Sequence, residues 1–115
     1  MNTKITYLYR DACNYKNINE VIVNGHLTAQ QKRKIISCCD CKHYFIPRQV
    51  GFPEVRFKKI DPEIDTCWFE IDEYSFEATS EKPTLDMTPE KVVKKFMEEK
   101  GRWDDTDTSW MTDEQ

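Results

Sequence analysis

KITYLYR, residues 4–10, has the pattern of a β-strand, and the rest of the fold can be predicted outward from it. Its side chains alternate with a period of two, and the β-prone residues Ile5, Tyr7 and Tyr9 fall on one face. The other face also carries an apolar residue, Leu8. Apolar groups on both faces favour a strand near the middle of a sheet.

The segment that follows predicts a hairpin and then a helix. Residues 11–17 (DACNYKN) are rich in loop formers, and a second β-prone run, residues 18–23, ends at Asn24-Gly25. The two strands are therefore expected to pair antiparallel. Thr28 and Gln31 have the spacing of a capping box, which predicts a helix over 29–39.

The second half repeats this order of elements. Residues 44–46 form a short apolar strand that Pro47 stops, and residues 66–72 alternate like a strand with one wet face. Tyr74 and Phe76 have the opposite parity, so a shift of register is expected near residues 72–73. A last helix is expected to start with Pro89 after a Thr88 cap and to end at Gly101.

The order β-β-α-β-β-α predicts an α+β fold with a small antiparallel or mixed sheet of three to four strands and helices on one face. Such a sheet keeps one face on which a partner could bind. At 115 residues the chain is expected to form a single domain over 1–101. Residues 102–115, acidic and rich in Thr and Ser, are expected to be a flexible tail.

Composition points to a soluble, cytoplasmic protein. No apolar run exceeds three residues, far short of a membrane span, and the N-terminus has no secretory signal pattern. Five cysteines, an odd number, are expected to be free thiols of a reducing compartment. No membrane partner is expected, and the sequence leaves the oligomeric state open.

Charge is unevenly distributed along the chain. Residues 1–60 hold 11 Lys/Arg against 4 Asp/Glu, and residues 61–81 hold 8 Asp/Glu and no Lys or Arg. Residues 82–115 hold 6 basic against 9 acidic residues, which gives the total of −4. The simplest interpretation is that folding brings the opposite blocks together; the alternative is an interaction surface for a charged partner.

One segment has the spacing of a metal site. Cys38 and Cys41 form a C-x-x-C pair, and His43 could add a nitrogen, but a structural zinc needs a fourth ligand from elsewhere. The competing interpretation is a set of ordinary free thiols. Pairing of Cys13 with His26 or His43 for nucleophilic catalysis has no support from spacing. We therefore assign no catalytic residue, expect no cofactor, and favour a protein that is not an enzyme.

The polar loop at residues 10–16 is richer than a connector requires, and loops on a rigid scaffold are where function concentrates. The candidate binding residues are Arg10, Asp11, Asn14, Tyr15, Lys16, Arg48 and Glu70. They predict a protein that binds another macromolecule, most simply another protein. The acidic blocks could also imitate a nucleic acid.

Two alternatives remain open. The first is a nucleic-acid-binding module, because the N-terminal half interleaves basic groups with tyrosines. The basic groups are Lys32, Arg33, Lys34, Arg48, Arg56, Lys58 and Lys59, and the tyrosines are Tyr7, Tyr9, Tyr15 and Tyr44. The second is a small Cys/His or metal-dependent enzyme.

ITYLYRDACNYK (residues 5–16), YFIPRQVGFP (residues 44–53) and WFE (residues 68–70) resemble a group of small uncharacterised bacterial or mobile-element proteins. The likeness covers roughly residues 4–72, and members of the group usually lack the cysteine cluster. The resemblance implies a bacterial or mobile-element origin and a compact fold, and it implies no activity or site residue.

Overall fold

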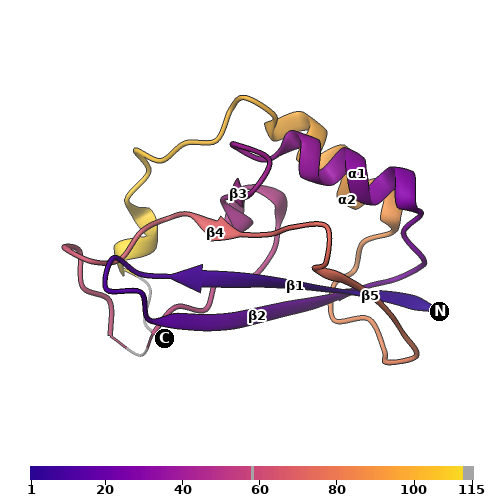
Figure 1. Ribbon diagram of the computed structural model, residues 1–115, viewed down its shortest axis with the longest axis horizontal. Helices are drawn as coiled ribbons and strands as arrows, with labels where there is room; N and C mark the ends of the chain where they lie inside the picture. Colours follow the sequence, from indigo (N-terminus) through magenta and orange to yellow (C-terminus); the bar gives the residue numbers. More distant parts are fainter. Residues whose placement is uncertain (58, 113–115) are drawn as a thin grey trace.

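The computed structural model describes residues 1–57 and 59–112. These residues form an antiparallel sheet with two helices, which confirms the predicted α+β class (Figure 1). In chain order the elements are β1 (Asn2–Arg10), β2 (Lys16–Val23), α1 (Ala29–Cys38), β3 (Tyr44–Phe45), a 3-10 helix (Pro47–Val50), β4 (Phe69–Glu70), β5 (Phe76–Thr79), α2 (Pro89–Glu99) and a second 3-10 helix (Ser109–Thr112).

β1 is the centre of the sheet, as its apolar groups on both faces predict. The strand order is β2-β1-β4-β3, and β5 also pairs with β1. Within the described residues the sheet thus has five strands, one more than the upper limit that the sequence predicts. β4 and β5 share one edge of β1: Tyr9 lies opposite Phe69 near one end, and Asn2 lies opposite Thr79 near the other.

The register shift predicted near residues 72–73 is present. Leu8 lies opposite Glu70, whereas Ile5, three residues earlier, lies opposite Phe76, six residues later. A turn absorbs the extra residues, because the Ser75 amide donates to the Asp72 carbonyl at 3.1 Å. The strand predicted over residues 66–72 is shorter than expected, since only Phe69–Glu70 joins the ladder.

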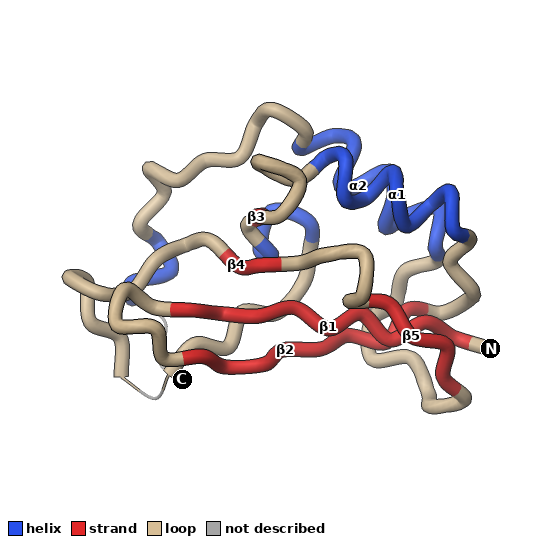
Figure 2. Tube along the Cα trace, viewed as in Figure 1, coloured by secondary structure: helices blue, strands red, loops and turns tan. Residues whose placement is uncertain are grey.

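Both helices lie side by side on one side of the strands (Figures 1 and 2). The capping box at Thr28 and Gln31 is present, and Pro89 occupies the first turn of α2 after the Thr88 cap, as predicted. Their buried faces meet the odd-numbered side of β1, where Ile5, Tyr7 and Tyr9 are almost fully buried. No helix formed by the described residues combines the length and hydrophobicity that a bilayer span demands.

Residues 102–112 pack against the rest of the chain. The indole nitrogen of Trp103 donates to the Cys38 carbonyl at 2.9 Å, and Trp110 is only 3% exposed, in a second cluster with Ile46 and Cys67. The sequence predicts a separate acidic tail over residues 102–115, because eleven of these residues are polar and dominate its composition. The two tryptophans of the segment are outnumbered in that composition. The mobility of the segment stays a prediction.

Candidate functional site

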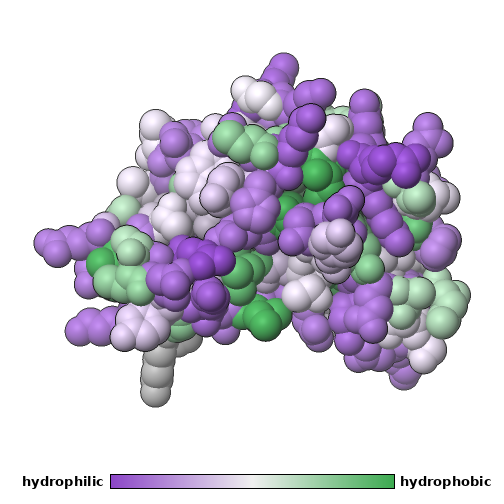
Figure 3. All heavy atoms as spheres, in the orientation of Figure 1, coloured by the Kyte–Doolittle hydropathy of each residue, from purple (hydrophilic) through white to green (hydrophobic). Residues whose placement is uncertain are grey.

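The helices leave one face of the sheet uncovered. On that face four side chains from four neighbouring strands form a row, because Leu8 lies opposite both Ile18 and Glu70, and Glu70 lies opposite Tyr44. Ile18 is 69% exposed and Tyr44 is 38% exposed. Figure 3 shows hydrophobic residues set among hydrophilic ones on the visible surface. Large apolar side chains left in water around polar groups are typical of a binding surface.

Glu70 of this row forms a network with two other polar side chains, Arg10 and His43. The Arg10 Nε donates to Glu70 Oε2 at 2.8 Å, and His43 Nε2 lies 3.1 Å from Glu70 Oε1. The side chains of Arg10 and His43 are 38% and 37% exposed, whereas that of Glu70 is only 16% exposed. The face therefore presents two basic groups to solvent and shields the carboxylate beneath them.

Both ring nitrogens of His43 face oxygen acceptors. Nδ1 lies 3.1 Å from the Ile71 carbonyl, and Nε2 faces Glu70. A neutral imidazole has one N–H and can donate only one of these bonds, whereas an imidazolium donates both. Neither nitrogen is turned toward solvent as a general base would be, so this geometry favours a positioning role over proton transfer.

Glu70 is shielded by the sheet, and this desolvation raises its pKa, but the hydrogen bonds from Arg10 and His43 outweigh it and leave the pKa below the ordinary value of 4.5. Since the folded-state pKa is the lower one, the stabilisation is present above the unfolded-state pKa. It is lost as the pH falls through the folded-state pKa.

We therefore expect Glu70→Gln to lower the free energy of unfolding by about 1 kcal/mol at neutral pH, a value discounted for solvent screening. The loss should shrink as the pH falls through the lowered folded-state pKa, because wild-type Glu70 then becomes protonated as well. Urea unfolding of both proteins at neutral pH and at acidic pH measures the difference. Glu77→Gln, at an exposed position of β5, is the control. An equal loss at both pH values would contradict the ionic contribution of Glu70.

The other predicted residues of this loop differ in what they contact. Asn14 adopts a left-handed conformation with φ 66°, and its Oδ1 accepts a hydrogen bond from Arg10. Asp11 is buried and its carboxylate accepts the amides of Cys13 and Tyr15, so it holds the turn. Tyr15 and Lys16 are exposed, and Lys16 lies opposite Arg10 in the hairpin.

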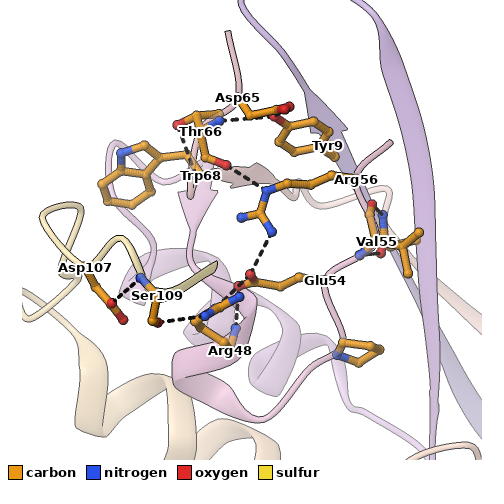
Figure 4. Close-up of polar contacts among 12 residues, drawn as sticks. Tyr9, Arg48, Glu54, Val55, Arg56, Asp65, Thr66, Trp68, Asp107 and Ser109 are labelled. Carbon is orange, nitrogen blue, oxygen red and sulfur yellow. Dashed lines mark hydrogen bonds and ion pairs between the residues drawn. The ribbon is translucent and has the colours of Figure 1, made fainter. Parts of the chain in front are cut away.

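Arg48 lies away from this face, in the ionic network of Figure 4. Its Nε donates to Glu54 Oε1 at 2.9 Å, and its backbone amide donates to Glu54 Oε2 at 2.8 Å. A further bond joins Arg48 Nη1 to Ser109 at 2.9 Å. Arg48 therefore connects the 3-10 helix Pro47–Val50 to the C-terminal segment, and the structure does not bring it to Arg10 and Glu70.

Arg56 occupies the centre of that network. Its side chain is fully buried; Nη1 donates to Glu54 Oε1 at 3.1 Å and Nε donates to the Thr66 carbonyl at 3.0 Å. Three aromatic rings surround the guanidinium, with centroids 5.3, 5.1 and 4.4 Å from its carbon. They belong to Tyr9, Phe69 and Trp110. We call these residues, with Glu54, the arginine cage, and its contacts are structural.

The structure does not bring together Cys38, Cys41 and His43, the residues with the spacing of a zinc site. Cys38 is buried, Cys41 is exposed, and both nitrogens of His43 are engaged by oxygen atoms. Among residues 1–57 and 59–112, no three His, Cys, Asp or Glu side chains are placed to hold an ion. Burial also raises the pKa of the Cys39 thiol to about 12, which makes it a poor nucleophile.

Cys13 and His26, whose pairing the sequence does not support, are separated by a whole strand. Cys13 precedes β2 and His26 follows it, and an eight-residue strand spans roughly 25 Å. For Cys13 and His43, the nitrogens of the histidine are already directed at Glu70 and Ile71. Neither histidine is therefore poised to activate this thiol.

The tyrosines and basic residues that could bind a nucleic acid do not form one exposed surface. Tyr7 and Tyr9 are buried, and Arg48 and Arg56 are engaged with Glu54. Part of the charge imbalance is cancelled within the fold, since Lys4 pairs with Glu81 and Arg10 with Glu70. A basic hollow of about 480 Å³ does border α1, lined by residues that include Lys32, Arg33 and Lys42, and Glu73 partly neutralises it.

Sequence reasoning did not place Leu8, Ile18 and Tyr44 in the site. Leu8 stood out only as an apolar residue on the second face of its strand, and the strand register is what aligns it with the other two. In comparisons with known proteins, no family model, curated protein or solved structure matches this chain. The inference of function therefore depends on geometry and charge.

Proposed function

We propose that this chain is a non-enzymatic protein-binding or accessory module, whose uncovered sheet face accepts an acidic segment of another protein that also carries apolar residues. The observation that carries the proposal is the Arg10–Glu70–His43 network, in which the two bases are more exposed than the acid. The apolar row beside it supplies the area that a protein partner would cover.

The chemistry of the network supports binding over catalysis. Glu70 fixes the guanidinium of Arg10 through two contacts, at 2.8 and 3.5 Å, so little side-chain freedom is left to lose when a partner binds. Arg and Tyr are also the residue types that most often dominate binding energy in protein interfaces. A cytoplasmic location and a bacterial or mobile-element origin are parts of this proposal; five free thiols support the first.

A photo-cross-linking experiment tests the proposal. Benzoylphenylalanine is introduced in place of Tyr44, and in a matched control in place of Tyr74, which is 86% exposed in the turn before β5. After irradiation in lysate of the source cells, we expect a discrete protein adduct from position 44 and none from position 74. Arg10→Gln in the position-44 protein should reduce the adduct about tenfold, the effect of losing one charged contact.

Three outcomes would contradict the proposal. They are identical adducts from both positions, no adduct at position 44, and an adduct that Arg10→Gln leaves unchanged. An adduct that nuclease removes would instead favour the nucleic-acid alternative, which the basic hollow at α1 keeps open. Far-ultraviolet circular dichroism of each variant verifies that the fold is intact.

A further inference from the structure

The outer edge of β2 is open along part of its length. β2 is the last strand in the order β2-β1-β4-β3. Its pairing with β1 makes alternate residues point their backbone groups outward. Ile22 identifies the outward set, because its amide donates to the Thr84 hydroxyl and its carbonyl accepts the amides of Thr84 and Leu85, all on the side away from β1. The other outward residues of β2 are Lys16, Ile18 and Glu20.

These three residues offer unpaired strand edge within the part of the chain that the structure describes. The contact with residues 84–85 covers only the Ile22 end. An edge with open N–H and C=O groups is a template for another strand. Apolar side chains flank it: Ile18 and Tyr15 are 69% and 68% exposed, and Val55, which is bonded to the side chain of Asn19, is 50% exposed.

We propose that this edge pairs with the same edge of a second copy of the chain, antiparallel and centred on Ile18. This register places Ile18 against Ile18 of the other copy, and Lys16 of each copy directly opposite Glu20 of the other. Each of the three pairs then exchanges two backbone hydrogen bonds, as outward-pointing residues in antiparallel strands do. The dimer joins the two sheets into one continuous sheet.

The charges of Lys16 and Glu20 favour a second copy of the chain as the partner, and they favour antiparallel pairing. Opposite charges that face one another across strands stabilise a pair, whereas like charges destabilise it. A parallel arrangement centred on Ile18 would set Lys16 against Lys16 and Glu20 against Glu20, and only the antiparallel one matches both. A two-fold axis also makes the interface self-complementary, as closed dimers require. The inference uses the backbone edge of β2 and stands apart from the proposed binding of a protein segment at Arg10.

Sedimentation equilibrium of the purified chain tests the dimer. We expect the mass to rise from 13.7 kDa toward twice that value, with a dissociation constant of about 10–100 µM, because a five-residue edge makes a small interface. Ile18→Pro should abolish the dimer and spare the fold, since proline removes the outward amide and leaves the ladder to β1 intact.

Charge reversal provides the matched control. Lys16→Glu and Glu20→Lys should each weaken the dimer at least about tenfold, because each sets like charges opposite one another at two symmetric places. The double reversal restores both pairs and should recover wild-type association. A chain that stays monomeric at about 1 mM would overturn the proposal. A dimer that Ile18→Pro and both single reversals leave unchanged would overturn it as well.

Discussion

Glu54→Ala is expected to lower the free energy of unfolding by about 3–5 kcal/mol, the loss typical of a buried charge deprived of its partner. Glu54 is only 3% exposed and its carboxylate binds two arginines. Arg48 lies near the surface and can recover water, but Arg56 is fully buried and cannot. Urea unfolding followed by tryptophan fluorescence measures the change.

Glu63→Ala is the matched control, because Glu63 is an exposed acid in the turn before Thr66. Its effect should stay within about 0.5 kcal/mol, as is usual for surface substitutions. A Glu54→Ala protein as stable as this control would mean that solvent reaches the arginine cage and screens it. Glu54→Gln should fall between the two, since an amide oxygen still accepts a hydrogen bond but carries no charge.

Trp110→Ala is expected to cost about 3–5 kcal/mol, the range for removing a large buried aromatic side chain. Trp110 is 3% exposed and its ring lies 4.4 Å from the Arg56 guanidinium carbon, closer than the other two rings of the arginine cage. Loss of the ring removes a cation–π contact and opens one side of the buried charge to water. Thermal unfolding followed by circular dichroism measures the effect.

Tyr74→Ala, at an aromatic position that is 86% exposed, is the matched control and should change the stability by less than about 0.5 kcal/mol. Hydrogen exchange of residues 102–112 gives a second readout. If these residues exchange as fast as an unfolded chain and Trp110→Ala has no effect, the segment is the flexible tail that its composition predicts. Slow exchange that the substitution abolishes would instead show that the segment belongs to the cooperative fold.

The sequence predicts those parts of the fold whose signals are local. The alternation of residues 4–10 identifies the central strand, and the Thr28–Gln31 spacing places the start of α1 at its observed residue. Neighbouring apolar residues of α2 differ in burial, since Met97 is 50% exposed whereas Phe96 is fully buried. Which apolar residue of a helix meets the sheet depends on the packing angle, and this is not encoded in periodicity.

The strand predicted over 66–72 illustrates how tertiary contacts override a local pattern. The alternation of this segment is real, but the Thr66 carbonyl accepts from Arg56 and the Thr66 amide donates to the Tyr9 hydroxyl at 3.1 Å. A backbone group used by a side chain is unavailable to a ladder. The short β3, two residues long, also limits what β4 can pair with.

The sequence indicates individual residues of the candidate site but does not indicate which of them lie together. Arg10, Asn14 and Glu70 stand out in the sequence as polar residues at a loop and on a wet strand face, and the structure joins them. Asp11 and Arg48 have the same appearance in the sequence, yet each is committed to the scaffold. Only the pairing of β4 with β1 and β3 decides which of these charges meet.

The position of Trp110 after both helices in the chain has a consequence for synthesis. A ribosome makes β1 first, but the aromatic ring nearest to Arg56 emerges only after α1 and α2. Until Trp110 is made, the guanidinium of Arg56 in the nascent chain lacks one of the three rings that surround it in the folded protein. A truncated product would keep this defect permanently, so quality-control proteases could recognise prematurely terminated copies by the exposed Tyr9 and Phe69 rings.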